Sequence, residues 1–457
     1  MAGTRSGCGK TTITLGLMAA FVRRGLRVAP FKVGPDFIDP GHHSAVAGNV
    51  SRNLDGWMLS KDYNIRCFQK HAAQAEIAVV EGVMGLFDGY DGKSEAGSAA
   101  QMAKWLDLPV LLITDASSMA RSAAALVQGF ERFDPDLHFA GVLFNSVGSP
   151  RHLSYLKEAL EDHVSMPCIG GIVRNADITI PERHLGLVTS QEQAFSAERI
   201  SRLDDLIESH VNLDDLLKHL PDFAFESVSE QNTPAQEKTV RIGIAWDKAF
   251  CFYYQDNLDM LRSFGAEPVF FSPITDNVLP ENLEGLYFGG GYPELFAEKL
   301  SANAQLRQQI RKESEKGMPI YAECGGFMYL CEQISDTEGK KYPMTGIFPF
   351  DTAMFPRLRS LGYREITLKN DTLLGNPGLR LRGHEFHYSG ITGDSGNKRM
   401  EKVYAVSDRS GESQMAEGYQ THRTLGSYIH LHFGSEPEAA RNFVNACREY
   451  RQERISA

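Results

Sequence analysis

Short apolar runs alternate with amphipathic segments over most of the chain. The runs are typical of strands buried in a parallel sheet, and the segments between them have the apolar spacing of helices. The strands predicted in the first part are 28–33, 77–81, 110–115 and 140–145, with helices at 13–24, 96–106 and 119–133. The strands predicted in the second part begin at residue 240 and include 268–271, 285–289 and 319–322. This alternation predicts an α/β fold with mainly parallel sheets.

A polar stretch separates the two alternating regions. Residues 187–220 are polar with a helical apolar period, and residues 221–239 are rich in Pro, Ser, Gln and Glu, as linkers are. At 457 residues the chain is also too long for one ordinary core. We therefore expect an N-terminal domain over 1–220, a linker over 221–239 and a C-terminal domain over 240–457.

Composition and charge argue against a membrane, secreted or nucleic-acid-binding protein. No run is long enough to span a membrane, and the N-terminus has no signal-peptide apolar region. The seven cysteines form no Cys-x-x-Cys pair, which favours a reducing cytoplasm and argues against a cysteine zinc site. A net charge of −11 argues against general affinity for nucleic acid. We expect a cytoplasmic protein with no membrane or nucleic-acid partner.

Residues 3–12 read GTRSGCGKTT and lead into the first predicted helix. Gly7 and Gly9 let successive backbone N–H groups curl round a phosphate, and Lys10 reaches the outer phosphate oxygens. The Thr11 hydroxyl suits Mg²⁺, and Thr12 follows it at the start of the helix. The stretch therefore predicts a nucleotide-binding phosphate loop.

Two features depart from the general phosphate-loop pattern. Thr4 stands where the pattern has glycine, and only Met1 and Ala2 precede the loop, although such a loop follows a strand. Either part of the first strand lies ahead of Met1, which is the alternative that we favour, or the loop is poorly anchored.

Asp36 and Asp39 follow the predicted strand 28–33, at the sheet edge where open parallel sheets bind ligands. They could hold a metal, orient a substrate or close an Asx turn. Because two of them occur beside a phosphate loop, we favour a role in function.

Three more polar residues lie at or just beyond predicted strand ends. Glu81 ends strand 77–81 in a carboxylate of the kind that a phosphate-loop enzyme needs for its Mg²⁺. Asp88 lies in a glycine-rich stretch that we expect to border the site. Asn145 ends another strand, where its amide could read a purine edge or cap a loop.

Residues 319–330 predict a nucleophile elbow. An apolar strand stops at Glu323, and Cys324 and two glycines lead directly into a helix-like segment. A cysteine on so tight a turn is held out at the end of a sheet, close to backbone N–H groups that favour its thiolate. The alternative is a packed structural cysteine.

Two other stretches supply partners for such a cysteine. Gly290 and Gly291 belong to a glycine turn that offers N–H groups to an oxyanion. His430 and His432 lie on a strand-like run, and either could deprotonate Cys324. Arginines between 357 and 382 form the best local basic patch for a polycarboxylate, or else a solvated charged face.

A phosphate loop joined to a cysteine hydrolase suggests one coupled reaction. The cysteine attacks the side-chain amide of glutamine and releases ammonia. ATP phosphorylates a carboxylate, because its oxygen is otherwise too poor a leaving group. Ammonia then displaces phosphate and leaves an amide.

The motifs of the chain resemble the cobyrinate a,c-diamide synthase family from Gly3 to about Cys447. The motifs that carry the resemblance are, in order, GTRSGCGKTT, KVGPDFIDPGHH, SRNLD, VVEGVMGLFDGYDG, GGGYPE, YAECGGFMYL, RGHEFHYS and SYIHLHF. The resemblance implies an N-terminal P-loop domain similar to dethiobiotin synthetase and a C-terminal class I glutamine amidotransferase domain with a flavodoxin-like fold. It also implies amidation of the a and c acetate groups of a cobalt corrinoid in cobalamin biosynthesis, with glutamine, ATP and Mg²⁺.

The resemblance also implies roles for single residues. Cys324 would be the nucleophile and His430 its base. The nucleotide, Mg²⁺ and activated-carboxylate positions would be Lys10, Thr11, Glu81, Asp36, Asp39 and Asp88. Class I amidotransferases usually have a glutamate two residues after the histidine, but His432 stands there, as it does in the family that the chain resembles. The usual carboxylate that orients the histidine is therefore absent, which implies slow glutaminase activity unless the synthetase domain is loaded.

Other interpretations stay open at this stage. The same amidation could act on hydrogenobyrinate or on nickel-sirohydrochlorin, whereas cobyric acid synthase fits the motif order and length less well. A ParA-like positioning ATPase is the alternative from another class, and Cys324 with His430 argues against it. The sequence leaves the oligomeric state open, including a homodimer.

Overall fold

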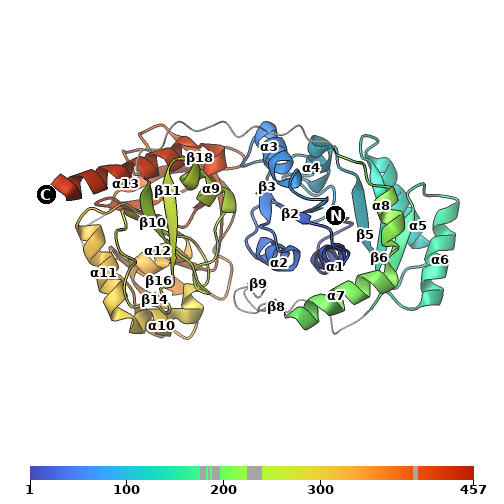
Figure 1. Cartoon of the computed structure of the whole chain (residues 1–457), viewed down its shortest axis with the longest axis horizontal. Helices are drawn as coiled ribbons and strands as arrows, with labels where there is room; N and C mark the ends of the chain where they lie inside the picture. Colours follow the sequence, from blue (N-terminus) through green and yellow to red (C-terminus); the bar gives the residue numbers. More distant parts are fainter. Residues whose placement is uncertain (175–181, 184–185, 188–195, 224–238, 395–399, 457) are drawn as a thin grey trace. The chain divides into compact units, whose positions relative to one another are not determined.

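A computed structural model describes residues 1–174, 182–183, 186–187, 196–223, 239–394 and 400–456. The chain forms two compact units, Met1–Glu230 and Gln231–Ala457, each built of helices and strands (Figure 1). The linker predicted at 221–239 lies largely outside the described residues. No described helix combines the length and apolar character needed to cross a membrane.

Unit 1 is built on parallel strands with helices on both faces. The strand order is β3 (Arg52–Leu54), β2 (Val28–Val33), β4 (Ile77–Glu81) in one sheet and β1 (Ala2–Gly3), β5 (Val110–Asp115), β6 (Phe139–Val147), β7 (Cys168–Val173) in another. A small antiparallel pair is formed by β8 (Glu182–Arg183) and β9 (Gly186–Leu187). The helices are α1 (Lys10–Arg23), α2 (Ile38–Ala47), α3 (Lys61–Ala72), α4 (Ala99–Leu106), α5 (Ser122–Phe133), α6 (Pro150–Glu161), α7 (Ala197–His210) and α8 (Leu213–Lys218).

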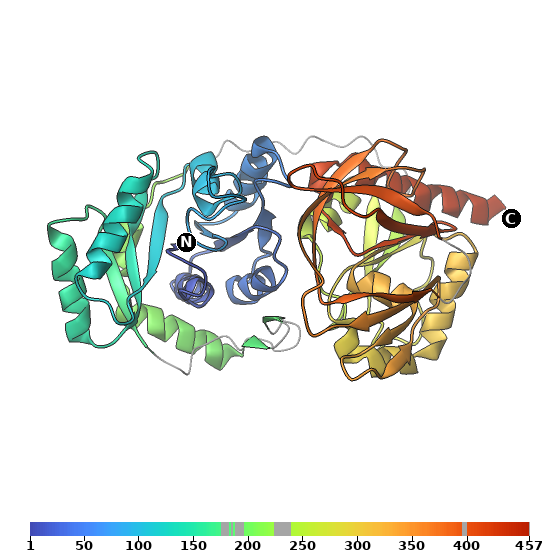
Figure 2. The same cartoon turned by 180° about the vertical axis from the view of Figure 1, so that it is seen from behind.

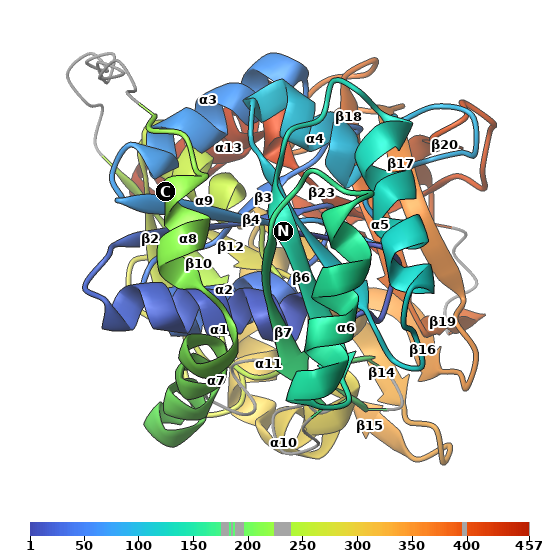
Figure 3. The same cartoon turned by 90° about the vertical axis from the view of Figure 1, so that its right-hand side faces the viewer.

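The alternation of side chains along β5 shows how the two faces are covered. Leu111 and Ile113 pack with α1 and α7, whereas Val110 and Leu112 pack with α4, α5 and α6. Successive strand residues point to opposite faces, so one apolar strand contributes to two separate cores. Helices α5 and α6 lie side by side over one face of this sheet (Figure 3).

A short strand precedes the phosphate loop. Strand β1 pairs in parallel with β5, and Met1 joins the two sheets of unit 1. The nitrogen of Met1 donates a hydrogen bond to the carbonyl oxygen of Val80, and the carbonyl oxygen of Met1 accepts one from the N–H of Gly82, both at 2.9 Å. The loop is therefore anchored to β4 and β5, which decides against a poorly anchored loop.

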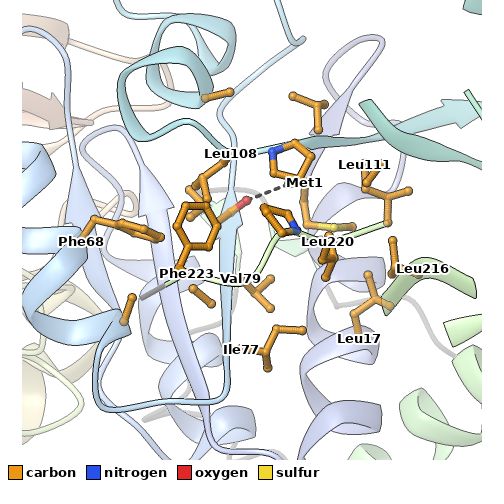
Figure 4. A pocket seen from close by; sticks show the side chains of 18 of the residues that line it. Met1, Leu17, Phe68, Ile77, Val79, Leu108, Leu111, Leu216, Leu220 and Phe223 are labelled. Carbon is orange, nitrogen blue, oxygen red and sulfur yellow. Dashed lines mark hydrogen bonds between the residues drawn. The ribbon is translucent and has the colours of Figure 1, made fainter. Parts of the chain in front are cut away.

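A cavity of about 700 Å³ lies in unit 1 beside Met1 (Figure 4). Its lining is largely apolar and includes Ile77 and Val79 of β4, Leu111 of β5 and Phe223. None of the loop residues 3–12 lines it, so the cavity is separate from the predicted nucleotide site.

Unit 2 combines a parallel and an antiparallel half in one ten-stranded sheet. Its parallel strands are β11 (Ala266–Phe271), β10 (Val240–Ala245), β12 (Gly285–Phe288), β13 (Ile320–Glu323) and β22 (Thr424–Ser427). The sheet continues with β21 (Glu417–Thr421), β20 (Lys402–Asp408), β17 (Ser360–Leu368), β18 (Arg380–His387) and β23 (His430–Leu431). These later strands are among the orange and red ones of Figure 2.

The remaining elements of unit 2 surround that sheet. A second sheet contains β15 (Lys341–Pro343), β14 (Cys331–Ser335), β16 (Phe348–Met354) and β19 (Ser389–Asp394). The helices are α9 (Gln255–Ser263), α10 (Ala297–Ala302), α11 (Ala304–Glu315), α12 (Gly325–Leu330) and α13 (Glu438–Ser456), with 3₁₀ turns η2 (Pro293–Phe296) and η3 (Phe433–Ser435).

The strand-like run that carries the two histidines is not a single strand. Strand β22 ends at Ser427, and the chain then crosses to the far edge of the sheet, where β23 pairs with β18. His430 lies on β23, whereas His432 lies beyond its end as the residue before η3. The two histidines therefore have different surroundings.

Candidate active sites

The phosphate loop depends on its glycines. Gly7 and Gly9 have φ values of 72° and 94°, a left-handed conformation that favours glycine. A Cβ atom on Gly9 would lie 2.2 Å from Nδ2 of Asn145. That nitrogen donates a hydrogen bond to the carbonyl oxygen of Cys8 at 2.9 Å. Asn145 therefore supports the loop directly, so one of its amide hydrogens is already engaged.

Lys10 is buried at the start of α1. Its Nζ donates a hydrogen bond to the carbonyl oxygen of Met84 at 2.5 Å. Burial is the main cause that lowers the pKa of Lys10 from its usual value. A phosphate bound at the loop would stabilise the positive charge of Lys10 and raise its pKa again.

Three buried side chains, those of Lys32, Asp39 and Glu81, meet the half-buried Thr11 at the end of β4. The hydroxyl of Thr11 donates a hydrogen bond to Oε1 of Glu81 at 2.6 Å. Nζ of Lys32 lies 2.5 Å from Oδ2 of Asp39 and 3.1 Å from Oε1 of Glu81. Parallel strands β2 and β4 supply Lys32 and Glu81, and α1 and α2 supply the other two. The carboxylates are therefore held by one cation and one hydroxyl.

Histidine His43 completes the surroundings of Glu81. Nε2 of His43 lies 2.7 Å from Oε2 of Glu81, and both side chains are fully buried. Burial alone would raise the pKa of Glu81, but the charge of Lys32 and the bond to His43 outweigh it and lower the pKa. The same attraction overcomes burial at Lys32 and raises its pKa. Glu81 is thus held as an anion inside the protein.

Asp39 and Asp36 differ in what they do. Burial, followed by repulsion from Asp36 and Glu81, raises the pKa of Asp39 well above its usual value. Within the described part of the chain, Oδ1 of Asp39 is buried without a hydrogen-bond partner. Oδ1 of Asp36 accepts hydrogen bonds from the N–H groups of Ile38 and Asp39. Asp36 therefore closes the Asx turn that starts α2.

The residues at this sheet edge fit Mg²⁺. Hard cations prefer oxygen ligands, and Thr11, Glu81 and Asp39 bring hydroxyl and carboxylate oxygens to one place. Oδ1 of Asp39 is a buried oxygen that still needs a partner. Asp88 lies on an exposed turn, where its Oδ2 accepts a hydrogen bond from the N–H of Gly85 at 2.9 Å, and Gly85 pairs with Gly3 at the start of the phosphate loop.

Unit 2 holds Cys324 on a strained turn between β13 and α12. Its φ is 46°, which is unusual for a residue with a side chain, as in a nucleophile elbow. The N–H of Cys324 donates a hydrogen bond to the carbonyl oxygen of Ser427 at 2.7 Å. A Cβ atom on Gly326 would lie 2.4 Å from the carbonyl oxygen of Phe288. The close approach of β12 to α12 therefore requires this glycine.

His430 is the histidine that the fold brings to the cysteine. It is 2% exposed, and burial alone would lower its pKa. Interaction with the thiolate of Cys324, followed by that with Glu323, outweighs burial and raises the pKa of His430 to about 9. Nδ1 of His430 lies 3.6 Å from Oε2 of Glu323. The imidazole of His430 therefore lies within hydrogen-bonding reach of the Cys324 sulfur.

His432 and His384 lie near His430 in other roles. Nδ1 of His432 accepts a hydrogen bond from the N–H of Gly434 at 3.0 Å, and burial lowers the pKa of His432 to about 4. The ring of His384 stacks on that of His430 with centroids 5.0 Å apart. Burial, followed by the charge of His430, keeps the pKa of His384 well below its usual value. Neither histidine is poised as the base.

The two glycines of the predicted oxyanion turn are not equivalent. The N–H of Gly290 donates a hydrogen bond to the carbonyl oxygen of Phe252 at 3.2 Å, so it is already engaged. A Cβ atom on Gly290 would lie 2.3 Å from Cε1 of His430, so this glycine makes room for the imidazole. The nitrogen of Gly291 lies close to Gly325, the residue after Cys324: a Cβ atom added to Gly325 would be 3.1 Å from it. Gly291 is therefore the better candidate for an oxyanion donor.

The arginine patch at 357–382 is partly neutralised. Arg364 pairs with Glu385 at 2.9 Å, and Arg382 pairs with Glu365 at 2.8 Å. These two arginines are structural cations of the β17–β18 ladder, which supports the alternative of a charged face for this part of the patch.

Sequence reasoning did not single out Lys32, His43 or Glu323. Lys32 interrupts an apolar strand, and charged residues are seldom buried without a partner. That signal could have identified Lys32, because its partners had to be the acidic residues at neighbouring strand ends. Glu323 ends a buried strand just as Glu81 does, and the same argument applies to it.

Comparisons with known proteins place the chain in a family. A model described as the CobQ/CobB/MinD/ParA nucleotide binding domain matches residues 1–188, and one described as the CobB/CobQ-like glutamine amidotransferase domain matches residues 241–438. Cobyrinate a,c-diamide synthase from Syntrophotalea carbinolica is 46% identical, with 98% of each chain covered. The proteins of that name from Leptospira interrogans and Dehalococcoides mccartyi are 44% and 43% identical, with 97% and 98% of each chain covered. The chain belongs to the cobyrinate a,c-diamide synthase family.

Proposed function

We propose that this protein amidates the a and c acetate carboxylates of cobyrinate in cobalamin biosynthesis, with glutamine as the nitrogen donor and ATP as the activator. The observation that carries this proposal is the Cys324–His430 pair, in a chain whose other unit has a phosphate loop beside a buried anionic Glu81. A nucleotide site explains activation of a carboxylate, and a cysteine site explains the supply of ammonia. Together they describe a glutamine-dependent carbon–nitrogen ligase.

The cysteine site would hydrolyse glutamine. His430 holds the proton of Cys324, and the sulfur attacks the carbonyl carbon of the glutamine side chain. The tetrahedral oxyanion is stabilised by the N–H of Gly291. The intermediate collapses as His430 gives the proton to the departing nitrogen, which leaves as ammonia. Water then cleaves the thioester, releases glutamate and returns the thiol.

The phosphate loop would activate the substrate carboxylate. The backbone N–H groups around Gly7 and Gly9, together with Lys10, bind the ATP phosphates. A substrate carboxylate oxygen attacks the terminal phosphorus, giving an acyl phosphate and ADP. Ammonia then attacks the acyl carbon, so that an amide forms and phosphate leaves. Asp36 and Asp88 lie on the loops that border this edge and would orient the substrate.

Thr11, Glu81 and Asp39 would hold Mg²⁺. When bound, the ion neutralises charge on the transferring phosphoryl group. Lys32 pairs with both carboxylates and holds them together.

A cytoplasmic location fits the cysteine content and the substrates of this reaction. We also propose that the protein forms a homodimer, and its molecular mass in solution tests this. Light scattering would give about twice the chain mass of 50.7 kDa for a dimer. A value near the chain mass would show a monomer.

The test is mass spectrometry of cobyrinic acid incubated with the protein, Mg-ATP and glutamine. The expected product is the diamide, lost in Cys324→Ala with glutamine and restored there by ammonium. Hydrogenobyrinate and nickel-sirohydrochlorin are run in parallel, and conversion of one of them alone would replace cobyrinate as the substrate. ATP turnover that ignores both glutamine and the corrinoid would instead indicate a positioning ATPase.

A further inference from the structure

We propose that Glu323, the residue directly before the nucleophile, positions His430 for glutamine hydrolysis and replaces the carboxylate that class I amidotransferases place two residues after the histidine. This inference rests on the proposed function of the Cys324 site. It assigns the role of orienting the histidine, for which the sequence motifs show no carboxylate.

The geometry supports this role from both sides of the carboxylate. Oε2 of Glu323 lies 3.6 Å from Nδ1 of His430, and the two side chains are 1% and 2% exposed. Oε1 accepts hydrogen bonds from the hydroxyl of Tyr321 at 2.7 Å and from the N–H of Leu431 at 3.0 Å. Leu431 follows His430 directly. The carboxylate therefore ties the strand that ends at the nucleophile to the strand that carries the base.

The donors that hold Glu323 are neutral. Besides Tyr321 and Leu431, the hydroxyl of Tyr287 donates to Oε2 at 3.2 Å. Across the described ranges, His430 is the one basic side chain that forms an ion pair with Glu323. Because hydrogen bonds fix the carboxylate without neutralising it, its charge acts on the imidazole.

Position 432 cannot supply this function. His432 has no carboxylate, its Nδ1 accepts the N–H of Gly434, and its ring packs on that of Tyr254 with centroids 4.5 Å apart. It lies beyond the end of β23 rather than behind His430. The carboxylate that lies beside His430 therefore comes from β13, which precedes the histidine in the sequence, and not from a position after it.

The consequence is chemical as well as geometric. With Nδ1 of His430 directed at Glu323, Nε2 is the nitrogen left to exchange a proton with Cys324. The carboxylate then fixes both the ring orientation and the tautomer, and stabilises the imidazolium that forms when the proton moves. The titratable groups that face His430 are Cys324 and Glu323 from β13 and its turn, and His384 and His387 from β18.

The first experiment compares two nitrogen sources in Glu323→Gln. Glutamine-dependent amidation should fall about a hundredfold in kcat with little change in KM for glutamine, while ammonium-dependent amidation stays within about twofold. Glu284→Gln is the matched control, because Glu284 is also buried in unit 2 and accepts a hydrogen bond from the N–H of Arg241 at 2.6 Å. The control should show no loss that is specific to glutamine.

A second readout separates positioning from structural support. NMR titration of the His430 imidazole should give a pKa near 9 in the wild type and a lower pKa in Glu323→Gln, because an attractive negative charge is lost. Glu323→Asp, which keeps the charge on a shorter side chain, should recover part of the glutamine-dependent rate.

Two results would overturn the inference. Equal losses with both nitrogen sources would show that Glu323 only supports the fold. An unchanged glutamine-dependent rate, or an unchanged His430 titration, would show that its charge does not act on the base. Failure of the proposed function is distinguishable, because the wild type would then amidate no corrinoid while the His430 titration could still be measured.

Discussion

Two buried glutamates end parallel strands in the two units, and each lies beside a histidine. Glu81 ends β4 beside His43, and Glu323 ends β13 beside His430. The first separation is 2.7 Å and the second 3.6 Å. The same local pattern, a carboxylate at the carboxyl end of a parallel strand, therefore occurs twice in one chain.

The partners of the two carboxylates differ, and with them their chemistry. Glu81 is surrounded by the cation Lys32, by His43 and by the Thr11 hydroxyl. Glu323 is held by phenol hydroxyls and a backbone N–H. A carboxylate that is paired with a lysine can instead bind a metal ion. A carboxylate that is held only by neutral donors keeps its full charge, which then acts on a neighbouring imidazole. Position in the fold alone does not decide the role.

The largest expected effect is that of Glu81→Gln. Loss of about 4 kcal/mol of charge stabilisation at the phosphoryl group corresponds to about a thousandfold lower rate. The loss should be equal with glutamine and with ammonium, as measured by diamide formation. Glu76→Gln, at the exposed start of the same strand region, is the control and should stay near wild type. A loss seen with glutamine alone would break the comparison.

Lys32→Met tests whether the cation holds the first cluster together. Removing it leaves Asp39 and Glu81 buried beside each other, which should lower the free energy of unfolding by about 3–5 kcal/mol. Added Mg²⁺ should raise the melting temperature more in the variant than in the wild type. Lys61→Met, an exposed change at the start of α3, should not alter it. Equal stability of Lys32→Met and wild type would contradict the account.

Glu417 extends the comparison to a buried carboxylate held by a hydroxyl and backbone N–H groups. Burial, partly offset by its bonds to Ser427 and Tyr428, raises its pKa from 4.5 to about 7. The folded state therefore retains the proton of Glu417 to a higher pH than the unfolded state does. The free energy of unfolding falls as pH rises from about 4.5 through 7, by up to about 3 kcal/mol. Thermal unfolding of Glu417→Gln should match wild type at pH 4 and exceed it at pH 8. The same pH dependence in both proteins would refute this.

Gly290→Ala should give the smallest of these effects. The new Cβ atom would meet the His430 imidazole and displace it from Glu323 and Cys324. We expect a loss of about a hundredfold or less in the glutamine-dependent rate, with ammonium-dependent amidation unchanged. Gly390→Ala is the control, because its Cβ atom would find ordinary contact distances. A wild-type rate in Gly290→Ala would show that the imidazole position is not critical.

The sequence was sufficient for many of the parallel strands and for both loop motifs, but not for the antiparallel strands of unit 2 or for the partners within each site. Strands β2, β4 and β5 have the predicted bounds because short, mostly apolar runs rich in branched residues are typical of strands buried in a parallel sheet. Lys32, His43 and Glu81 come from three separate elements, so spacing along the chain could not show that they meet. From the sequence, either His430 or His432 could be the base, and it is the end of β22 at Ser427 that gives the two histidines different neighbours.

The most direct test of the central claim is a competition between nitrogen sources. Wild type, Glu81→Gln and Glu323→Gln would each receive amide-¹⁵N-glutamine together with unlabelled ammonium, and the isotope content of the corrinoid amides would be measured by mass spectrometry. The account predicts mostly ¹⁵N product from wild type, little product but the same isotope ratio from Glu81→Gln, and a shift to unlabelled product from Glu323→Gln. An isotope ratio for Glu323→Gln equal to that of wild type would contradict it.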